Sequence, residues 1–275
     1  SKSVGGPEVS YDCESFLRSL LQVDGVLYGE GEKSFPALIG ITQRVKDANP
    51  LSKTFPDGAA WLDENGIFHQ TSPQPLTPME DLPFIYDEAG RMDGFKNRII
   101  YYETSRGCPF SCSYCLSSID KKLRFRPLDT VKKGTAFFLE QRVPQVKFVD
   151  APFKLRKKYT CKLAIWQLFA TMDNGVTNFH FEIAADILDE EEIALLKTMR
   201  PGLVQLEIGV QTANHDTIHQ QQKDGFGTCA QVTEKIRQFH NIHQHLDLIA
   251  GLPLEDYESF GHSFDVVYQM KPSQL

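Results

Sequence analysis

Three cysteines lie within eight positions of this 275-residue chain, in the segment Arg106-Gly107-Cys108-Pro109-Phe110-Ser111-Cys112-Ser113-Tyr114-Cys115. Thiolates this close can share one metal centre. A structural zinc site takes four ligands, and no fourth cysteine or histidine lies nearby in the sequence. A cubane iron–sulfur cluster also takes four cysteines as a rule, so three would leave one iron open to another ligand. An iron–sulfur cluster is the first interpretation, and zinc or a chance grouping of structural cysteines are the alternatives.

The composition is that of a globular chain with enough apolar material for a core. Hydrophobic residues make up 41% and charged residues 24%, which excludes disordered, collagen-like and mucin-like proteins. Six cysteines are too few for a disulfide scaffold, and those outside the cluster are expected to be buried apolar residues (Cys13, Cys161 and Cys229). A formal net charge of −7 argues against a protein that binds nucleic acid through its phosphates.

No segment of the sequence predicts a membrane partner. No stretch approaches the roughly 20 apolar residues of a membrane helix, and the N-terminus lacks the charged-then-apolar layout of a secretory signal. We therefore expect a cytoplasmic protein with neither a membrane nor a nucleic-acid partner.

The elements that must position the cysteines alternate regularly from residue 98 onward. Strands are predicted over residues 99–104, 146–150, 178–185, 203–210 and 245–250, and helices over 128–141, 161–172, 189–199 and 254–270, with helical segments up to 239. Five such repeats are typical of an α/β fold with a parallel sheet and right-handed crossovers. The cysteine segment follows the first strand, where a βα barrel carries its active-site loops.

The predicted strands also alternate apolar and polar residues. In residues 178–183, for example, Phe179, Phe181 and Ile183 alternate with polar side chains. Apolar faces would pack under the helices, and polar faces would line a common interior, as in a partly open barrel that holds a polar ligand. A one-sided antiparallel sheet facing solvent is the alternative, which the intervening helices disfavour.

The first 97 residues are less regular. Residues 1–50 contain one short apolar strand over 23–28 and helical patterns on either side, typical of the tail of an α/β domain. Residues 51–97 are interrupted by prolines and glycines and are predicted to be an irregular linker, with a hairpin at 63–66. The expected domains are therefore 1–50, 51–97 and 98–275.

The C-x3-C-x2-C spacing, with Tyr114 just before the third cysteine, resembles the signature of the radical S-adenosylmethionine (radical SAM) enzymes. Other segments are similar to the B12-binding branch of that family: Gly5-Gly6-Pro7-Glu8, Val26-Leu27-Tyr28-Gly29-Glu30-Gly31-Glu32, Tyr102-Glu103-Thr104-Ser105-Arg106-Gly107-Cys108, Leu206-Glu207-Ile208-Gly209-Val210-Gln211 and Asp247-Leu248-Ile249-Ala250-Gly251-Leu252-Pro253. The resemblance implies a partial parallel (βα) barrel of radical SAM type, preceded by a remnant of an α/β cobalamin-binding domain.

The resemblance also implies cofactors and the residues that bind them. Cys108, Cys112 and Cys115 would hold a four-iron, four-sulfur (4Fe-4S) cluster, and the fourth iron would bind S-adenosylmethionine and cleave it reductively to a 5′-deoxyadenosyl radical. The remaining cofactor-binding positions implied are Tyr114 at the adenine, Asp150 near the methionine amino group, Glu182, Glu207 and Gln211 at the ribose or substrate, and Ile249 and Gly251 around the adenine pocket.

The chain departs from the family pattern in three ways. The D-x-H-x-x-G signature of cobalamin binding is absent, so we do not expect this chain alone to bind cobalamin. Ala151-Pro152-Phe153-Lys154 is unlike the run expected after the second strand, and a sixth strand would begin near Leu275. The full-length protein is expected to be a radical SAM enzyme, and a cobalamin-dependent methyltransferase is one such reaction. A non-catalytic iron–sulfur or zinc-binding module is the competing hypothesis.

An electron donor such as flavodoxin or ferredoxin is the expected partner, and the substrate is unknown. A basic run follows the cysteine segment and is either a solvated loop or a binding site for an anion or a reductase: Lys121, Lys122, Arg124 and Arg126. Arg106 is the better candidate for electrostatic support of an anionic cluster.

Overall fold

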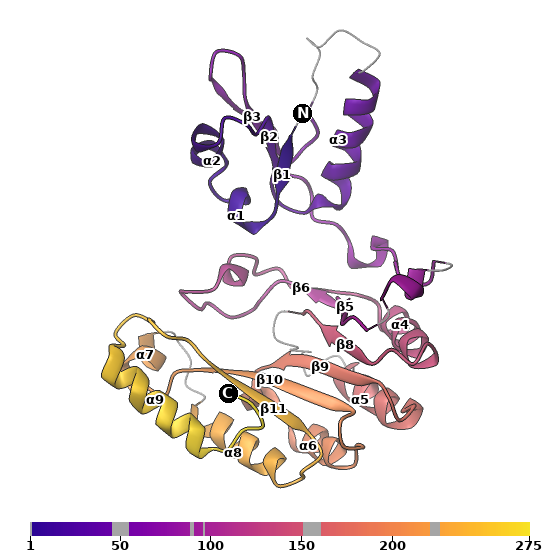
Figure 1. Ribbon diagram of the computed structural model, residues 1–275, viewed down its shortest axis with the longest axis vertical. Coiled ribbons are helices and arrows are strands. Elements are labelled where there is room, and N and C mark those ends of the chain that lie inside the picture. The colour runs from indigo at the N-terminus through magenta and orange to yellow at the C-terminus, as the bar shows by residue number, and fades with distance from the viewer. Residues whose placement is uncertain (1, 46–54, 89–90, 96, 151–160, 221–225) are drawn as a thin grey trace. The chain divides into compact units, whose positions relative to one another are not determined.

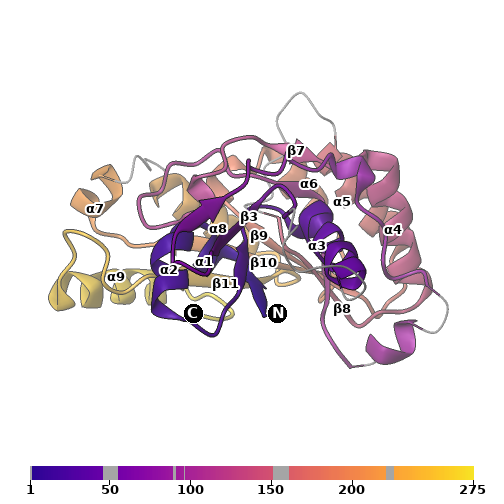
Figure 2. The ribbon, with the colours of Figure 1, turned by 90° about the horizontal axis from the view of Figure 1, so that it is seen from above.

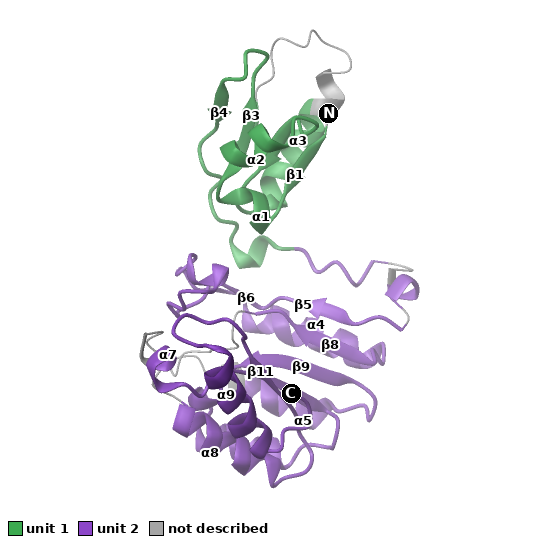
Figure 3. Ribbon diagram, turned by 60° about the vertical axis from the view of Figure 1, so that its left-hand side comes forward, with its two compact units in different colours: residues 1–82 green, residues 83–275 purple. Residues whose placement is uncertain are grey.

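A computed structural model describes residues 2–45, 55–88, 91–95, 97–150, 161–220 and 226–275. The chain divides into two compact units, Ser1–Leu82 and Pro83–Leu275, shown in different colours in Figure 3. Within the described residues, no helix combines the length and the apolar character needed to cross a membrane.

The first unit is a small α/β layer around a four-stranded sheet in the order β1-β2-β3-β4 (Figures 1 and 3). The first two strands are parallel, and the last two continue antiparallel. The elements are β1 (Ser3–Gly5), α1 (Pro7–Ser10), α2 (Cys13–Ser19), β2 (Gly25–Leu27), α3 (Gly31–Val45), β3 (Ala59–Leu62), β4 (Phe68–Gln70) and the 3-10 helix η1 (Met79–Asp81).

Alternation along β2 places its neighbouring side chains in two separate hydrophobic clusters. Val26 packs with residues of α1 and α2, and Leu27 packs with Leu38 of α3. Because successive side chains of a strand point to opposite faces, the two helix groups cover opposite faces of this sheet.

The structure differs from the predicted linker over 51–97. Residues 59–62 and 68–70 form the hairpin β3–β4 and belong to the first sheet. The hairpin expected at 63–66 is confirmed: Gly66 N–H donates to Asp63 O at 2.9 Å, and the Asp63 side chain accepts from Asn65 N. The units divide between Leu82 and Pro83, and Phe84 and Tyr86 already pack in the core of the second unit.

The second unit contains a fully parallel five-stranded sheet in the order β5-β8-β9-β10-β11. All five strands predicted from residue 98 onward are confirmed, and so are the helices between them, with ends shifted by a few residues. The elements are η2 (Arg91–Phe95), β5 (Ile100–Tyr102), β6 (Ser105–Arg106), η3 (Leu116–Ser118), β7 (Arg124–Phe125), α4 (Leu128–Glu140), β8 (Gln145–Phe148), α5 (Cys161–Met172), β9 (Asn178–Ile183), η4 (Ala185–Ile187), α6 (Glu190–Lys197), β10 (Val204–Gln211), α7 (His215–Gln220), α8 (Phe226–Arg237), β11 (His243–Leu248) and α9 (Tyr257–Gln269).

Helices α4 and α9 lie at opposite ends of this sheet, beside β5 and β11 (Figures 1 and 2). Aromatic residues dominate the core between the sheet and its helices. Phe179 and Phe181 of β9 are fully buried, Phe179 stacks on Phe169 of α5 with ring centroids 4.1 Å apart, and Phe148 stacks on Phe181 at 4.4 Å. The expected apolar face is therefore the helix-covered one, and the alternate residues form a polar face.

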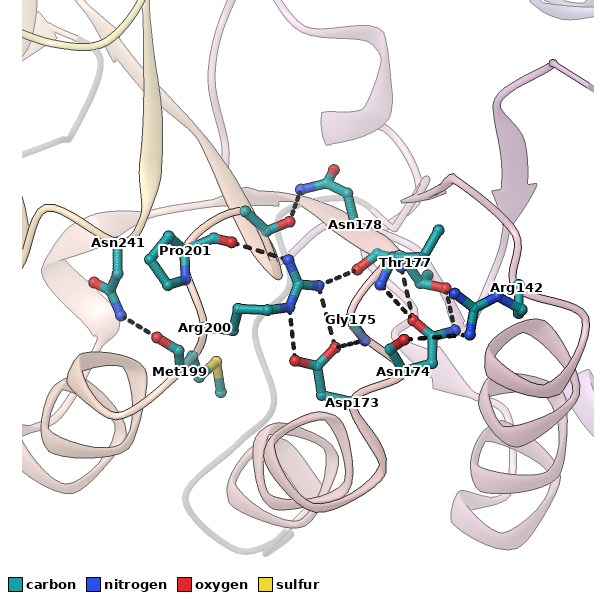
Figure 4. Close-up of polar contacts among 12 residues, drawn as sticks. Arg142, Asp173, Asn174, Gly175, Thr177, Asn178, Met199, Arg200, Pro201 and Asn241 are labelled. Carbon is teal, nitrogen blue, oxygen red and sulfur yellow. Dashed lines mark hydrogen bonds and ion pairs between the residues drawn. The ribbon is translucent and has the colours of Figure 1, made fainter.

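A polar cluster joins the loops at the amino ends of the strands (Figure 4). Arg200 Nε and Nη2 donate to the two carboxylate oxygens of Asp173 at 2.7 and 3.1 Å, and Nη2 also donates to Thr177 O. Asn241 donates to Met199 O at 2.7 Å. In a parallel α/β sheet, ligands bind at the carboxyl ends of the strands, and this cluster lies at the opposite, amino ends. These contacts therefore serve to connect the helices to the strands.

Candidate active site

The cysteine loop leaves the sheet after β5 and is closed at its base. Strands β6 and β7 pair antiparallel, and Cys108 N–H donates to Asp120 O at 2.9 Å. Gly107 has φ +88°, and a Cβ there would lie 2.5 Å from Lys122 O. Only glycine fits so close a backbone crossing at that φ, so Gly107 determines how the loop folds back on itself.

Two further backbone hydrogen bonds shape the part of the loop that carries the thiols. Cys115 N–H donates to Cys112 O at 3.2 Å, and Ser118 N–H donates to Cys115 O at 3.0 Å. Burial raises the pKa of the Cys108 thiol, and the neighbouring Cys115 and Cys112 raise it further. Burial and the adjacent Cys112 likewise raise the pKa of the Tyr114 hydroxyl. A thiolate at Cys108 therefore needs a positive partner, such as a metal.

The three thiols face a cavity of about 210 Å³ at the carboxyl ends of the parallel strands. Its lining brings together the cysteine loop and the ends of β9, β10 and β11. Seven predicted site residues contribute to it: Cys108, Cys112, Tyr114, Cys115, Glu182, Glu207 and Gln211. Phe110, Ser118, Ile183, Ala184, Gly209 and Asp247 complete the lining. Residues distant in the sequence thus meet where parallel α/β sheets bind ligands.

A lysine holds the two glutamates of the cavity wall. Lys147 Nζ, from β8, donates to Glu207 Oε2 at 2.9 Å and lies 3.3 Å from Glu182 Oε1. His180 Nε2 lies 2.8 Å from the same Glu207 oxygen. The sheet register explains the arrangement, because Lys147 pairs with His180 and Glu182 pairs with Glu207 on neighbouring strands.

The charges of this network shift its pKa values in opposite directions. Burial raises the pKa of Glu207, but the Lys147 ammonium and His180 outweigh burial and hold it below its usual value. For Lys147 burial lowers the pKa, and the two glutamates outweigh burial and raise it. Burial and Lys147 lower the pKa of His180. At neutral pH, these shifts favour a charged Lys147–Glu207 pair beside a neutral His180 imidazole.

Burial also raises the pKa of Asp247 at the cavity wall, and the nearby Glu207 raises it further, while His245 opposes the shift. His245 Nε2 lies 3.2 Å from Asp247 Oδ1. The wall between β9 and β11 therefore carries three carboxyl groups, and it suits a ligand that is cationic or rich in hydrogen-bond donors.

Gln211 reaches the cavity through an unusual backbone turn. Its φ is +72°, and the register between β10 and β11 shifts between Gly209 and Gln211. The side chain folds back over Gly209, where an added Cβ would lie 2.1 Å from Gln211 Nε2. The carbonyl of Gln211 accepts from Ile249 N at 2.9 Å. Gly209 thus leaves the space that the Gln211 amide occupies.

Three predicted cofactor-binding residues do not line this cavity. Asp150 is buried, and one carboxylate oxygen accepts from Thr104 N at 2.6 Å and from Ser105 N at 2.7 Å, while the other accepts from the Thr104 hydroxyl. Burial raises the pKa of Asp150 to about 6, against the effect of these hydrogen bonds. Asp150 therefore connects the ends of β5 and β8. Ile249 and Gly251 lie beyond β11, and the run 151–154 falls outside the described residues.

The basic residues around the loop turn out to have different surroundings. Arg106 donates to both oxygens of Glu103 at 2.8 and 3.0 Å, and Arg124 pairs with Asp120 at 3.4 Å. Arg126 is buried, with its guanidinium carbon 5.9 Å from the centroid of the Tyr102 ring. Lys121 and Lys122 are exposed.

Sequence reasoning missed Lys147 as a site residue. Its signal was the alternation of residues 145–148, where Val146 and Phe148 are buried against the helices and Lys147 must point the other way. Its partners lie on other strands, 35 and 60 residues away along the chain, so no local motif marks them.

The donor set of the loop fits an iron–sulfur cluster. In the described part of the chain, no three His, Cys, Asp or Glu side chains converge to hold a single ion. A cubane binds each thiolate through a different iron, so its ligands line a shared space without converging on one point. Cys108, Cys112 and Cys115 line one cavity in that way.

Comparison with known proteins agrees with this geometry. Residues 102–267, more than half of the chain, match the Radical SAM superfamily. The chain belongs to the radical SAM superfamily. The cofactors of radical SAM proteins are a 4Fe-4S cluster and S-adenosylmethionine, which this family uses for radical chemistry.

Two curated relatives are methyltransferases by name. The chain is 27% identical over 169 residues to "Uncharacterized methyltransferase PH0819" of Pyrococcus horikoshii, covering 59% of this chain and 36% of the relative. It is 25% identical over 276 residues to "2-(S-pantetheinyl)-carbapenam-3-carboxylate methyltransferase" of Streptantibioticus cattleyicolor, covering 93% of this chain and 39% of the relative. The chain thus spans well under half the length of either.

Two solved radical SAM structures share the fold. The methyltransferase TsrM of Kitasatospora setae, solved with cobalamin and a 4Fe-4S cluster, matches 98% of this chain and 53% of its own at a TM-score of 0.73 and 15% identity. The cobalamin-dependent enzyme OxsB matches 96% of this chain and 38% of its own at a TM-score of 0.70 and 17% identity.

Proposed function

We propose that Cys108, Cys112 and Cys115 hold a 4Fe-4S cluster at which S-adenosylmethionine is cleaved reductively. The observation that carries this proposal is the shared cavity, in which the three thiols face Glu182, Glu207 and Gln211. When bound, the cluster supplies an electron to the sulfonium and leaves its fourth iron for the amino acid part of S-adenosylmethionine. This reaction yields methionine and the 5′-deoxyadenosyl radical.

The surrounding residues bind and orient the cationic cofactor. Glu182 and Glu207, both paired with Lys147, accept hydrogen bonds from the ribose hydroxyls or from the substrate. Gln211 adds an amide to the same wall, and Tyr114 packs at the adenine. Asp150 acts indirectly, because it holds Thr104 and Ser105 at the start of the cysteine loop. Ile249 and Gly251 remain predicted to border the adenine.

The five-stranded sheet then forms the wall of a partial (βα) barrel, and the first unit corresponds to the end of a cobalamin-binding domain. Support comes from the fold match to cobalamin-dependent enzymes across nearly the whole chain. Relatives named as methyltransferases support methyl transfer as the reaction of the full-length protein. The domain division into 1–50, 51–97 and 98–275 then changes to 1–82 and 83–275.

Radical SAM chemistry requires an external reductant, and we propose a flavodoxin or ferredoxin in the cytoplasm for this role. The family assignment supports the need for an electron donor.

The experiment is anaerobic reconstitution with iron and sulfide, followed by reduction with dithionite in the presence of S-adenosylmethionine. We expect visible absorbance of a cluster and formation of 5′-deoxyadenosine, both lost in Cys112→Ala. The matched control is Cys13→Ala, which removes a buried cysteine of the first unit and should change neither. A cluster without product would favour the non-catalytic module, and zinc in place of iron would overturn the proposal.

A further inference from the structure

The side chain of Lys121 crosses the cysteine loop and bonds the segment between the first two cysteines. Its ammonium donates to Phe110 O and lies 3.2 Å from Ser111 Oγ. Phe110 and Ser111 are two of the three residues that join Cys108 to Cys112. A lysine that follows the cysteine segment thus contacts the backbone between two of its thiols.

The backbone on either side of Lys121 is fixed against the start of the same segment. Asp120 O accepts from Cys108 N at 2.9 Å, and Lys122 O lies so close to Gly107 that an added Cβ there would be 2.5 Å away. Because both neighbours are held, the Lys121 side chain starts from a defined position. Its hydrogen bonds therefore cost less conformational entropy than those of a lysine on a free loop.

The positive charges at the cysteine loop differ in their partners. Arg106, which the sequence favours for electrostatic support of an anionic cluster, donates to both oxygens of Glu103 at 2.8 and 3.0 Å. Among the described residues, no carboxylate lies within ion-pair distance of the Lys121 ammonium. A carboxylate therefore compensates the charge of Arg106, whereas Lys121 brings an uncompensated charge to the cysteine segment.

We propose that Lys121 is a positioning residue for the cluster: it holds the segment from Cys108 to Cys112 in the conformation that binds iron, and its charge favours the reduced cluster. The inference rests on the proposed function. Three thiolates bring negative charge to the loop, and the electron that the cluster gains from an external reductant adds to it. Because the net charge around an iron–sulfur cluster sets its potential, an ammonium held at the loop should raise that potential.

Four variants of the whole chain separate the hydrogen bonds from the charge. Lys121→Met removes both, Lys121→Arg keeps a donor and the charge, and Ser111→Ala removes one acceptor and leaves the charge. The matched control is Lys122→Met, which makes the same change at the next exposed lysine. Lys122 bonds Asp120 through its backbone N–H, and within the described residues its ammonium makes no hydrogen bond.

The first measurement is amide hydrogen exchange over residues 108–115 of the cluster-free chain. Exchange should be about two- to tenfold faster in Lys121→Met, because the hydrogen bonds across the loop are lost. Ser111→Ala should lie between Lys121→Met and wild type, while Lys121→Arg and Lys122→Met should match wild type. Equal exchange in Lys121→Met and wild type would overturn the positioning role.

The second measurement is an equilibrium redox titration of the reconstituted cluster. Removing one exposed charge should change the reduction equilibrium about two- to fivefold, which lowers the potential of a one-electron couple by about 20–40 mV. The shift should appear in Lys121→Met, shrink at high salt, and be absent from Lys121→Arg and Ser111→Ala. Loss of iron to a chelator should also be faster in Lys121→Met than in Lys122→Met.

Three outcomes separate the inference from its alternatives. An equal shift of the potential in Lys122→Met would mean that only the net surface charge matters, and an unchanged potential in Lys121→Met would refute the electrostatic role. A wild-type chain that binds no cluster would instead count against the proposed function. Hydrogen exchange of the cluster-free chain would then still decide whether Lys121 positions the loop.

Discussion

Replacing Gly209 by alanine should displace the Gln211 amide from the cavity at little cost in stability. A Cβ at position 209 would lie 2.1 Å from Gln211 Nε2, and ordinary contacts begin at 3.4 Å, so the amide must move by at least about 1.3 Å. Among the described residues, the only other atom within 4 Å is Gln211 Cδ at 3.4 Å, so no described backbone obstructs the methyl group. Because alanine also reduces the freedom of the unfolded chain, the free energy of unfolding should change by less than about 1 kcal/mol.

Displacement of the Gln211 amide from the cavity should weaken the binding of S-adenosylmethionine. A neutral hydrogen bond contributes about 0.5–1.5 kcal/mol, which corresponds to a roughly two- to tenfold weaker affinity. The assay is an anaerobic titration of S-adenosylmethionine into cluster-loaded wild type, Gly209→Ala, Gln211→Ala and the double variant. If Gly209 acts only by leaving room for Gln211, the two substitutions should not add, and the double variant should bind like Gln211→Ala.

Two results would refute this reasoning. Gly209→Ala could weaken binding as much in the Gln211→Ala background as in wild type, which would mean that position 209 touches the ligand or shifts the strand. The thermal midpoint could also fall by more than a few degrees, which would mean that β10 does not accept a methyl group there.

Three further substitutions test the charges around the site and the strand ends. Lys147→Met should raise the pKa of Glu207, because it removes the ammonium whose hydrogen bond and charge hold that pKa down. The acid limb of the pH profile of S-adenosylmethionine binding should then move to higher pH. Asp150 has a folded pKa of about 6, above its unfolded value near 3.9, so its stabilising effect is complete below about pH 4 and is lost as the pH rises through 6. The free energy of unfolding of Asp150→Asn should therefore rise, relative to that of wild type, by up to about 3 kcal/mol between pH 4 and pH 8. Chemical denaturation at both pH values measures this difference, and a difference that does not change with pH would contradict the raised pKa. Arg200→Ala should lower the free energy of unfolding by about 1–2 kcal/mol without changing 5′-deoxyadenosine formation. Because the Arg200 hydrogen bond lowers the pKa of Asp173, the stability difference between variant and wild type should shrink as the pH falls below about 4. A loss of activity at equal stability would contradict the structural role.

The predicted elements of the second unit agree with the structure because their signals are local. Alternation with period two in residues 178–183 and 204–211 determines which side chains face the helices, and Asp189 and Asp256 mark helix starts through their capping boxes. The boundary between the units was not predictable in the same way. Whether residues 59–62 form a strand depends on the neighbouring β2, which supplies the hydrogen-bond partners.

The site likewise combines features with local sequence signals and features that depend on distant segments. Seven of the ten predicted site residues line the cavity, because the cysteine spacing and the polar positions of β9 and β10 are visible along the chain. Asp150 follows its strand as expected, yet its carboxylate is used by Thr104 and Ser105, which the sequence places 46 and 45 residues away. Whether a carboxylate binds a ligand or the backbone depends on which groups reach it after the strands pair.

The order of the elements, the parallel sheet and the cysteine loop could all be predicted from the sequence, since residue spacing along a strand, a helix or a short loop is a local property. The pairing of Lys147 with both Glu182 and Glu207, the space that Gly209 leaves for Gln211, and the cavity shared by the three thiols and the ends of β9 and β10 appear only in the folded chain. Those outcomes depend on strand register and on backbone crossings between distant segments, and the register is settled only when the sheet assembles on its core.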